Sequence, residues 1–185
     1  MMARAFAEIA FTPSVRAAQD RFGSGKAGER FLSEEIDRRD TLTDNEASFI
    51  QARDGFYLGT FSEDGWPYIQ FRGGPAGFLR VLDEKTIAWA DFRGNRQYLS
   101  AGNLGANDRV SLFLMDYPNR RRLKPWGRAQ IVEAAENPGL VEALFPEGYK
   151  AIPERLVSVT VAAFDWNCPQ HIPQRLTAEE WAAVE

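Results

Sequence analysis

Two arginines and two amide side chains share a short loop that has the right chemistry to bind an anion. The loop, Phe92-Arg93-Gly94-Asn95-Arg96-Gln97, follows an apolar stretch at 87–90 and precedes a segment that can form a short helix. Guanidinium groups donate charge-assisted hydrogen bonds to phosphate oxygens, and free backbone N–H groups near a helix start attract the same ligand. The spacing therefore predicts a phosphate-binding turn in which Arg93 and Arg96 flank Gly94-Asn95.

Other basic residues gather near predicted strand ends, although the chain as a whole carries a net charge of −4. They are Arg72, Arg120, Arg121, Arg122 and Lys124. For any single exposed arginine, a solvated rim is the simpler interpretation. The run Arg120-Arg121-Arg122 has two interpretations, a grip on an anionic ligand tail or on the acidic surface of a partner, and the sequence favours neither.

Aromatic and methionine side chains recur close to these basic groups. They are Phe71, Trp89, Phe92, Met115, Tyr117 and Trp126. Most of them should belong to a hydrophobic core. An aromatic or methionine wall beside a phosphate site is also what a planar, phosphorylated cofactor requires.

The usual catalytic constellations are scarce. The only cysteine, Cys168, and the only histidine, His171, are three residues apart, so a Cys–His nucleophile pair competes with a structural tail segment. No spacing predicts a metal site, and no carboxylate pair stands out as an acid/base couple. The glycine-rich stretch at 22–28 lacks the spacing of a nucleotide loop, so we interpret it as a flexible connection.

Composition restricts the class of protein. With 185 residues, of which 44% are hydrophobic, the chain is long enough for one domain with a real core, and thirteen Phe with five Trp suit a β-rich interior. The acidic balance argues against nucleic-acid binding. One cysteine cannot form an internal disulfide, which favours a reducing cytoplasm. The sequence has no signal-peptide pattern and no apolar stretch long enough to span a membrane.

Hydrophobic periodicity predicts a mainly β fold with a few peripheral helices. Thr43 and Glu46 form a capping box for a helix at 44–53 that Gly55 ends, and an Asp-Gly turn at 62–65 predicts a hairpin. Strands are predicted at 56–61, 66–72, 78–82, 86–90, 110–115, 126–132 and 156–164. Further helices begin at Pro138 and after Thr177. Close strands with tight turns indicate an antiparallel barrel.

Several segments together resemble a known family, the flavin-nucleotide-binding proteins related to pyridoxamine 5'-phosphate oxidase, which share an FMN-binding split β-barrel. The similar segments are Gly65-Trp66-Pro67-Tyr68-Ile69-Gln70-Phe71-Arg72-Gly73-Gly74, Asp91-Phe92-Arg93-Gly94-Asn95-Arg96-Gln97-Tyr98, Asn107-Asp108-Arg109-Val110, Met115-Asp116-Tyr117-Pro118 and Asp165-Trp166-Asn167-Cys168-Pro169-Gln170-His171-Ile172. The resemblance implies a split-barrel domain at 42–166, between a lead-in at 1–41 and a C-terminal tail at 167–185.

The resemblance also implies FMN bound between the two subunits of a cytoplasmic homodimer. Gln70, Phe71 and Arg72 would lie along the flavin ring and ribityl chain. The cofactor-binding segment Asp91, Phe92, Arg93, Asn95, Arg96 and Gln97 would hold the phosphate through its Arg, Asn and Gln residues. Met115, Asp116 and Tyr117 would come near the ring, from the same or the neighbouring subunit.

One departure from the family bears on the substrate. True pyridoxamine phosphate oxidases carry a further C-terminal segment rich in Arg and Trp, whereas only residues 177–185 follow Arg175-Leu176 here, and Gln70 to Arg72 replace the usual Arg-to-Lys pattern. We therefore expect an FMN-dependent oxidoreductase that acts on another small substrate, with a nicotinamide nucleotide as a possible donor. The alternative is a non-enzymatic flavin- or haem-binding module for storage, sensing or stress response.

Overall fold

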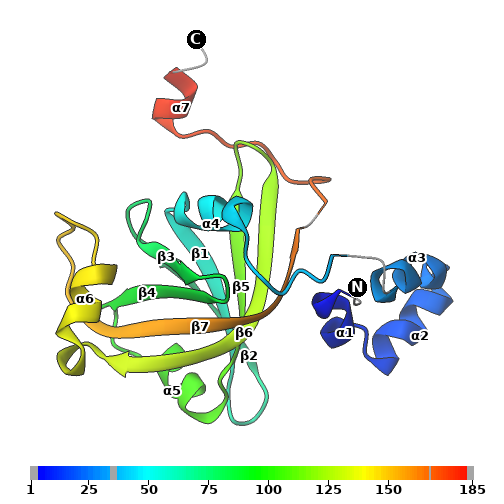
Figure 1. The fold of residues 1–185 in the computed structure, drawn as a ribbon, viewed down its shortest axis with the longest axis horizontal. Coiled ribbons are helices and arrows are strands. Elements are labelled where there is room, and N and C mark those ends of the chain that lie inside the picture. Colours follow the sequence, from blue (N-terminus) through cyan, green and yellow to red (C-terminus); the bar gives the residue numbers. More distant parts are fainter. Residues whose placement is uncertain (1–3, 34–36, 167, 183–185) are drawn as a thin grey trace.

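The computed structural model describes residues 4–33, 37–166 and 168–182. Seven strands form one sheet: β1 Gly55–Phe61, β2 Pro67–Gly73, β3 Leu79–Asp83, β4 Thr86–Phe92, β5 Arg109–Asp116, β6 Arg121–Glu133 and β7 Pro153–Trp166. The helices are α1 Ala5–Ala10, α2 Pro13–Arg21, α3 Gly25–Glu29, α4 Asp44–Gln51, α5 Leu99–Ala106, α6 Pro138–Leu144 and α7 Ala178–Ala182, with 3-10 turns η1 Arg30–Leu32 and η2 Ala134–Glu136. Figure 1 shows the curled sheet with these helices around it.

The sheet is an antiparallel barrel with a gap between its two edges. Its strand order is β2-β1-β5-β6-β7-β4-β3, so that β2 and β3, neighbours in sequence, lie at opposite edges. Curling brings the two halves together inside: the Phe56 ring lies 5.0 Å from Trp89 and 6.0 Å from Phe78. Burial alternates along β5, because successive side chains point to opposite faces. The predicted mainly β split barrel is confirmed.

Helices cover the barrel at several places. α4 lies over one end and contributes Phe49 and Ile50 to the core (Figure 1). α6 covers β4 and β7, where Leu144 packs with Leu156 in a smaller cluster. The predicted capping box is confirmed, since Glu46 accepts a hydrogen bond from the Thr43 N–H, and the helix predicted after Thr177 begins with a similar bond, from the Thr177 N–H to Glu180. No helix in the described part of the chain is both long and apolar enough to cross a membrane.

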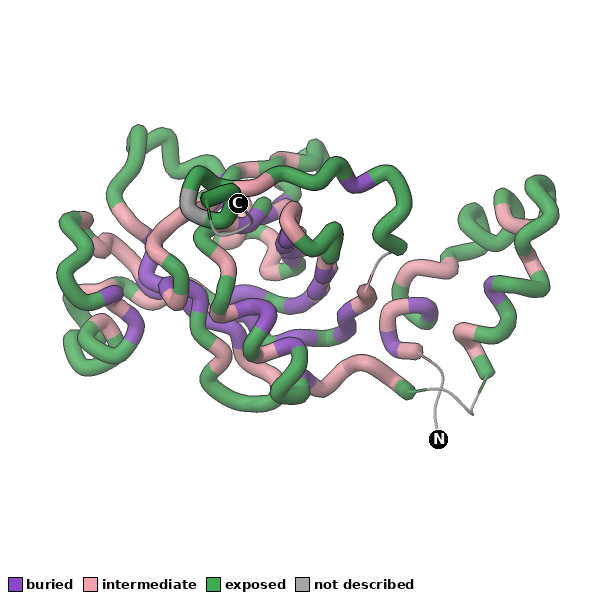
Figure 2. Tube along the Cα trace, turned by 90° about the horizontal axis from the view of Figure 1, so that it is seen from above, coloured by how far each residue is buried: buried purple, intermediate pink, exposed green. Residues whose placement is uncertain are grey.

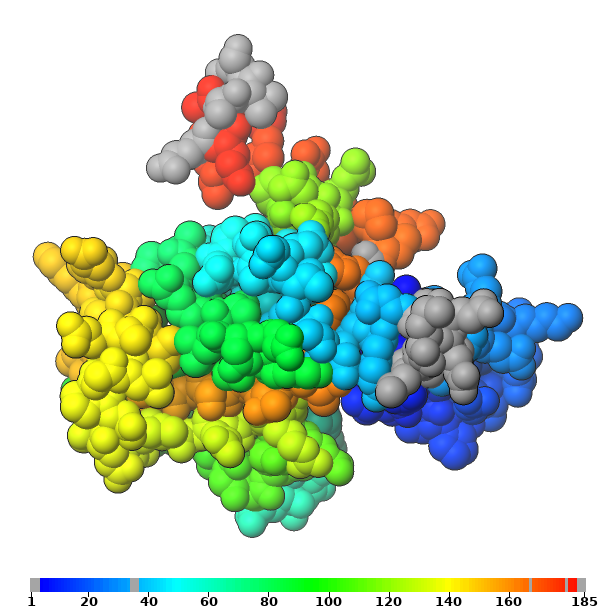
Figure 3. All heavy atoms as spheres, viewed as in Figure 1, coloured from blue at the N-terminus to red at the C-terminus, as the bar shows by residue number. Residues whose placement is uncertain are grey.

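The N-terminal helices form a lobe beside the barrel, and α7 projects from its upper end (Figure 3). Buried residues concentrate in the strands, whereas the lobe is largely exposed (Figure 2). The Phe6 ring packs on Trp126 at 4.5 Å, and the Arg4 guanidinium lies 3.5 Å from the Asp165 carboxylate. The prediction of a flexible connection at 22–28 is wrong in part, because residues from Gly25 onward form α3.

Several predicted boundaries differ from the structure, and two of the differences have a clear cause. β6 begins at Arg121 rather than 126, because Arg121 and Arg122 pair with Asp116 and Met115 of β5 and thereby extend the strand into the predicted basic loop. Gly55 does not end α4. It opens β1, directly under the ring of Phe71, where a side chain would clash. Neither difference was visible in local sequence, since both depend on a neighbouring strand.

Candidate functional site

A buried carboxylate joins two arginines across the gap of the barrel. Asp91, at the end of β4, is only 4% exposed. Its Oδ1 lies 2.8 Å from Nη1 of Arg72 on β2, and its Oδ2 accepts hydrogen bonds from Nη2 and Nε of Arg155 on β7 at 2.9 and 3.2 Å. Asp91 therefore holds both guanidinium groups in place, and Nη2 of Arg155 also donates to Glu154 Oε2 at 3.3 Å.

The two arginines keep capacity for a ligand. Nε of Arg72 is buried and has no hydrogen-bond partner in the described part of the chain. Burial opposes the charged form of Arg155, but the hydrogen bond and the charge of Asp91 outweigh it and raise the pKa of that guanidinium. The Arg155 guanidinium also lies over the Tyr98 ring at 4.9 Å. Asp91 thus holds both guanidinium groups in position before any ligand binds.

The loop between β4 and α5 supplies backbone donors. Arg96 and Tyr98 both have left-handed backbone conformations, with φ of +62° and +55°. Tyr98 is the N-cap of α5, and its side chain makes no capping hydrogen bond. The first N–H groups of a helix have no acceptor within the helix, so the N-terminus of α5 attracts an anion. Here the turn predicted from the sequence precedes a helix as expected.

A small pocket unites these groups. Its walls come from β2, the β4–α5 loop, the first turn of α5 and the start of β7. The lining residues are Gln70, Arg72, Phe92, Gly94, Asn95, Arg96, Tyr98, Leu99, Ser100, Ala101 and Arg155. We call it the anion pocket. Three arginines line it and no carboxylate does, so it is chemically suited to a phosphate group.

The remaining predicted residues of the loop lie around this pocket rather than in its lining. Arg93 turns outward, where its Nε donates to Glu154 Oε1 at 2.8 Å. This hydrogen bond, with the charges of Arg155 and Arg96, holds the pKa of Glu154 below its ordinary value. The Gln97 N–H donates to Asn95 Oδ1 at 3.1 Å, which shapes the turn. Asp91 lies beneath the pocket, where its carboxylate holds Arg72 and Arg155 in position.

The structure does not bring Phe71 or residues 115–117 into the anion pocket. Phe71 lies on the other face of β2, its ring centroid 5.5 Å from that of Tyr57. Asp116 is buried, accepts hydrogen bonds from Asn119 and lies 3.7 Å from Arg53, so it stabilises the β5–β6 turn.

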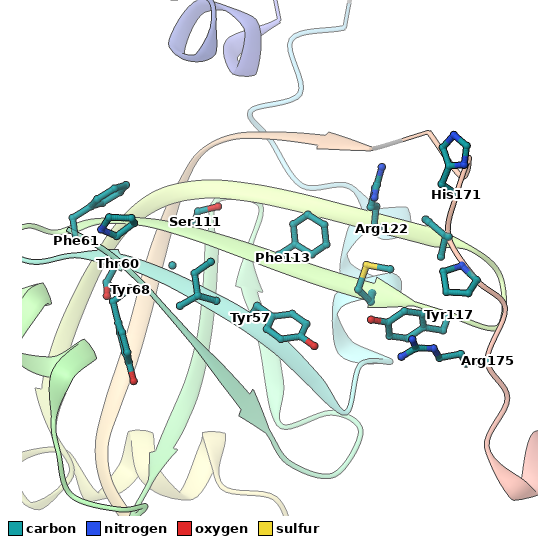
Figure 4. Close-up of a pocket in the computed structure, with 16 residues that line it drawn as sticks. Tyr57, Thr60, Phe61, Tyr68, Ser111, Phe113, Tyr117, Arg122, His171 and Arg175 are labelled. Atoms are coloured by element: carbon teal, nitrogen blue, oxygen red, sulfur yellow. The ribbon is translucent and has the colours of Figure 1, made fainter. Parts of the chain in front are cut away.

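Met115 and Tyr117 line a second, larger depression that we call the groove (Figure 4). It has a volume of about 710 Å³ and lies along the outer face of β1, β2, β5 and β6, with the tail at 171–175 as one wall. Its lining residues are Tyr57, Gly59, Thr60, Phe61, Pro67, Tyr68, Ile69, Ser111, Phe113, Met115, Tyr117, Arg122, His171, Ile172, Pro173 and Arg175. It is mostly apolar, as small-molecule sites usually are.

The anion pocket and the groove meet on β2. Tyr68 borders the groove, and its hydroxyl donates a hydrogen bond at 3.2 Å to Gln70 Oε1, which also accepts one from the Ser100 hydroxyl at 3.3 Å. Because Gln70 and Arg72 point to one face of β2 and Ile69 to the other, the two depressions lie on opposite sides of this edge strand.

Sequence reasoning missed Arg155 and Ser100. Arg155 stands opposite Asp91 in the β4–β7 register, a pairing between residues 64 positions apart. Its only local signal was a charged Glu-Arg pair just before a predicted strand. The structure does not support Cys168 and His171 as a nucleophile pair. The Cys168 sulfur accepts a hydrogen bond from the Gln170 N–H, and no contact within the described residues joins it to His171.

Comparison with known proteins agrees with this architecture. The family model for pyridoxamine 5'-phosphate oxidase matches residues 42–166. HupZ of Group A Streptococcus superposes with a TM-score of 0.55 at 16% identity, covering 73% of this chain and 99% of that one. An FMN-binding protein from Syntrophomonas wolfei superposes with a TM-score of 0.51 at 14% identity, covering 66% and 83%. No curated protein matches the chain. The extent of the family match shows that this chain belongs to the pyridoxamine 5'-phosphate oxidase family.

Proposed function

We propose that this protein binds FMN and uses it as an oxidoreductase acting on a small substrate. The observation that carries the proposal is the anion pocket, in which Asp91 holds the guanidinium groups of Arg72 and Arg155 beside the uncapped start of α5. The phosphate of FMN is dianionic near neutral pH and accepts several hydrogen bonds. Arg72, Arg155 and Arg96, with the first N–H groups of α5, offer it both charge and donors.

The size of the pocket limits which part of the cofactor enters it. Its volume of about 30 Å³ is too small for the ribityl chain or the ring, so only the anionic end of the cofactor could enter it. The ribityl chain and ring would continue along β2 past Gln70 and Tyr68. When bound, the flavin ring supplies hydride and electron transfer, while the protein supplies position and electrostatics.

A homodimer would complete this site. The β1–β2 hairpin exposes five large apolar side chains, Tyr57, Phe61, Trp66, Ile69 and Phe71, with Trp66 73% exposed. Contiguous exposed apolar surface of this kind marks an interaction site. A second copy seated on the hairpin would cover it and enclose the adjacent ring-binding surface. Sedimentation of the purified protein should then report twice the 20.9 kDa of one chain.

The decisive experiment compares FMN with riboflavin, which lacks the phosphate. Quenching of flavin fluorescence during titration measures both affinities. We expect FMN to bind at least about a hundredfold more tightly, since two or more charge-assisted hydrogen bonds are at stake. Equal affinities would refute the assignment of the anion pocket.

Anaerobic addition of NADH or NADPH then tests whether the protein is an oxidoreductase. Bleaching of the bound flavin at a catalytically useful rate supports the oxidoreductase. A flavin that binds through its phosphate but is reduced by neither nucleotide would instead support a non-enzymatic flavin-binding module.

A further inference from the structure

We propose that the groove binds a small planar substrate that carries a carboxylate, a conjugated aromatic acid, with Arg122 and Arg175 as the residues that recognise the acid. The inference deepens the proposed function, because such a molecule in the groove would lie next to the surface assigned to the flavin ring. It concerns binding alone, so it can be tested separately from any redox reaction.

The charge of the groove is the first argument. Acidic residues outnumber basic ones in the chain by 26 to 22, yet none of the sixteen residues that line the groove is acidic. Two of the sixteen are arginines, Arg122 and Arg175, and His171 is a further residue that can donate a hydrogen bond. In Figure 4, Arg122, His171 and Arg175 lie towards the same end, with Phe61 at the other. The groove is therefore cationic at one end and apolar along its length.

Neither arginine is neutralised by the protein. The side chains of Arg122 and Arg175 have no ion pair and no hydrogen bond within residues 4–33, 37–166 and 168–182, and Nε of Arg122 is buried without a partner. Their recorded contacts are with aromatic faces: Arg122 lies 6.0 Å from the Phe113 ring centroid and Arg175 4.9 Å from that of Tyr117. Such contacts orient a guanidinium but leave its hydrogen-bond donors free.

The neighbouring Arg121 shows the contrast. Its guanidinium donates to Asn45 Oδ1 at 3.4 Å and lies over the rings of both Phe49 and Trp166. Because a buried donor without a partner is unfavourable, Nε of Arg122 requires an acceptor from outside the chain, and the exposed Arg175 can add a second contact to the same ligand. A carboxylate fits, since it accepts paired hydrogen bonds from guanidinium groups.

The walls determine the rest of the ligand. Tyr57 and Phe113 are opposite each other on β1 and β5, and Ile69 and Met115 extend the same face. These side chains offer a flat apolar surface on which an aromatic ring can stack, and in the proposed dimer the second copy, seated on Tyr57 and Ile69, would close over that ring. A volume of about 710 Å³ lies within the range of sites for small molecules. An aromatic acid matches both the wall and the cationic end.

The test uses 2-naphthoate and its neutral isostere 2-naphthamide, with binding to the full-length protein measured by calorimetry. We expect naphthoate to bind about a hundredfold more tightly than the amide, since two charge-assisted contacts distinguish them. Arg122→Gln and Arg175→Gln should each weaken the binding of naphthoate about tenfold and change the affinity for the amide less than about twofold. Arg122→Lys, which keeps the charge, should retain most of the preference.

Arg80→Gln is the matched control. Arg80 is exposed on β3, at the opposite edge of the sheet, so its loss should affect neither probe. Equal affinity for the two probes, or equal effects of Arg80→Gln and Arg122→Gln, would overturn the proposal. So would displacement of naphthoate by riboflavin, because the groove would then hold the flavin ring itself.

The outcomes separate this inference from the proposed function. Suppose that the wild-type protein prefers naphthoate but binds FMN no better than riboflavin. This result would support the groove as a site for an aromatic acid and refute the anion pocket as the site of the FMN phosphate. A protein that binds FMN through its phosphate but does not discriminate between the probes would refute the groove alone.

Discussion

Replacing Arg155 with glutamine gives the sharpest test of the anion pocket. The substitution removes the charge-assisted hydrogen bond that Arg155 would donate to the proposed phosphate but leaves Arg72 paired with Asp91 at 2.8 Å. A hydrogen bond to a charged group contributes about 1.5–3 kcal/mol, and about 1.4 kcal/mol corresponds to a tenfold change in affinity. Arg155→Gln should therefore weaken FMN binding roughly 10- to 150-fold and leave riboflavin binding nearly unchanged.

The same change has a cost in stability that must be measured alongside. The Arg155 side chain is 14% exposed and Asp91 only 5%, so the lost bonds are partly buried, and we expect the free energy of unfolding in urea to fall by about 1–3 kcal/mol. Arg128→Gln serves as the control. It breaks the exposed ion pair with Asp108 at 2.7 Å and should change the affinity for neither FMN nor riboflavin. Parallel weakening of FMN and riboflavin by Arg155→Gln would show that the phosphate is not bound here.

Three further predictions concern other parts of the chain. Arg96→Ala should reduce FMN retention on gel filtration far more than Arg121→Ala, because only Arg96 lines the anion pocket; equal retention would mean that the phosphate loop is misplaced. Burial alone would raise the pKa of Glu46, but hydrogen bonds from its capping-box and strand neighbours outweigh it and lower that pKa. Its stabilising effect is thus present above the ordinary glutamate pKa of about 4.3 and lost as pH falls through the lowered value. Glu46→Gln should destabilise the fold by about 1–2 kcal/mol in urea titrations at pH 7, with the difference from wild type vanishing in strong acid; a constant difference would contradict this. Ile69→Asp should shift sedimentation to the monomer mass, whereas Leu82→Asp, at another exposed apolar site on the opposite edge strand, should not; identical masses for both variants would count against the proposed dimer.

The sequence alone determined the features that depend on near neighbours. The capping box at Thr43, the Asp-Gly turn before Trp66 and the alternation in residues 156–164 predicted a helix, a hairpin and a strand, because each pattern acts through hydrogen bonds or side-chain directions within a few residues. The same local reasoning placed Arg96 in a turn before a helix, and the order of short motifs indicated the family.

Only the tertiary structure decided which groups meet. It turned Arg93 outward to Glu154, brought Arg155 opposite Asp91 and placed the free arginines 122 and 175 at one groove. These encounters depend on strand register and on the curl that brings β2, β4 and β7 together. No short stretch of sequence encodes them, since register is set by the summed packing of whole strands against a shared core.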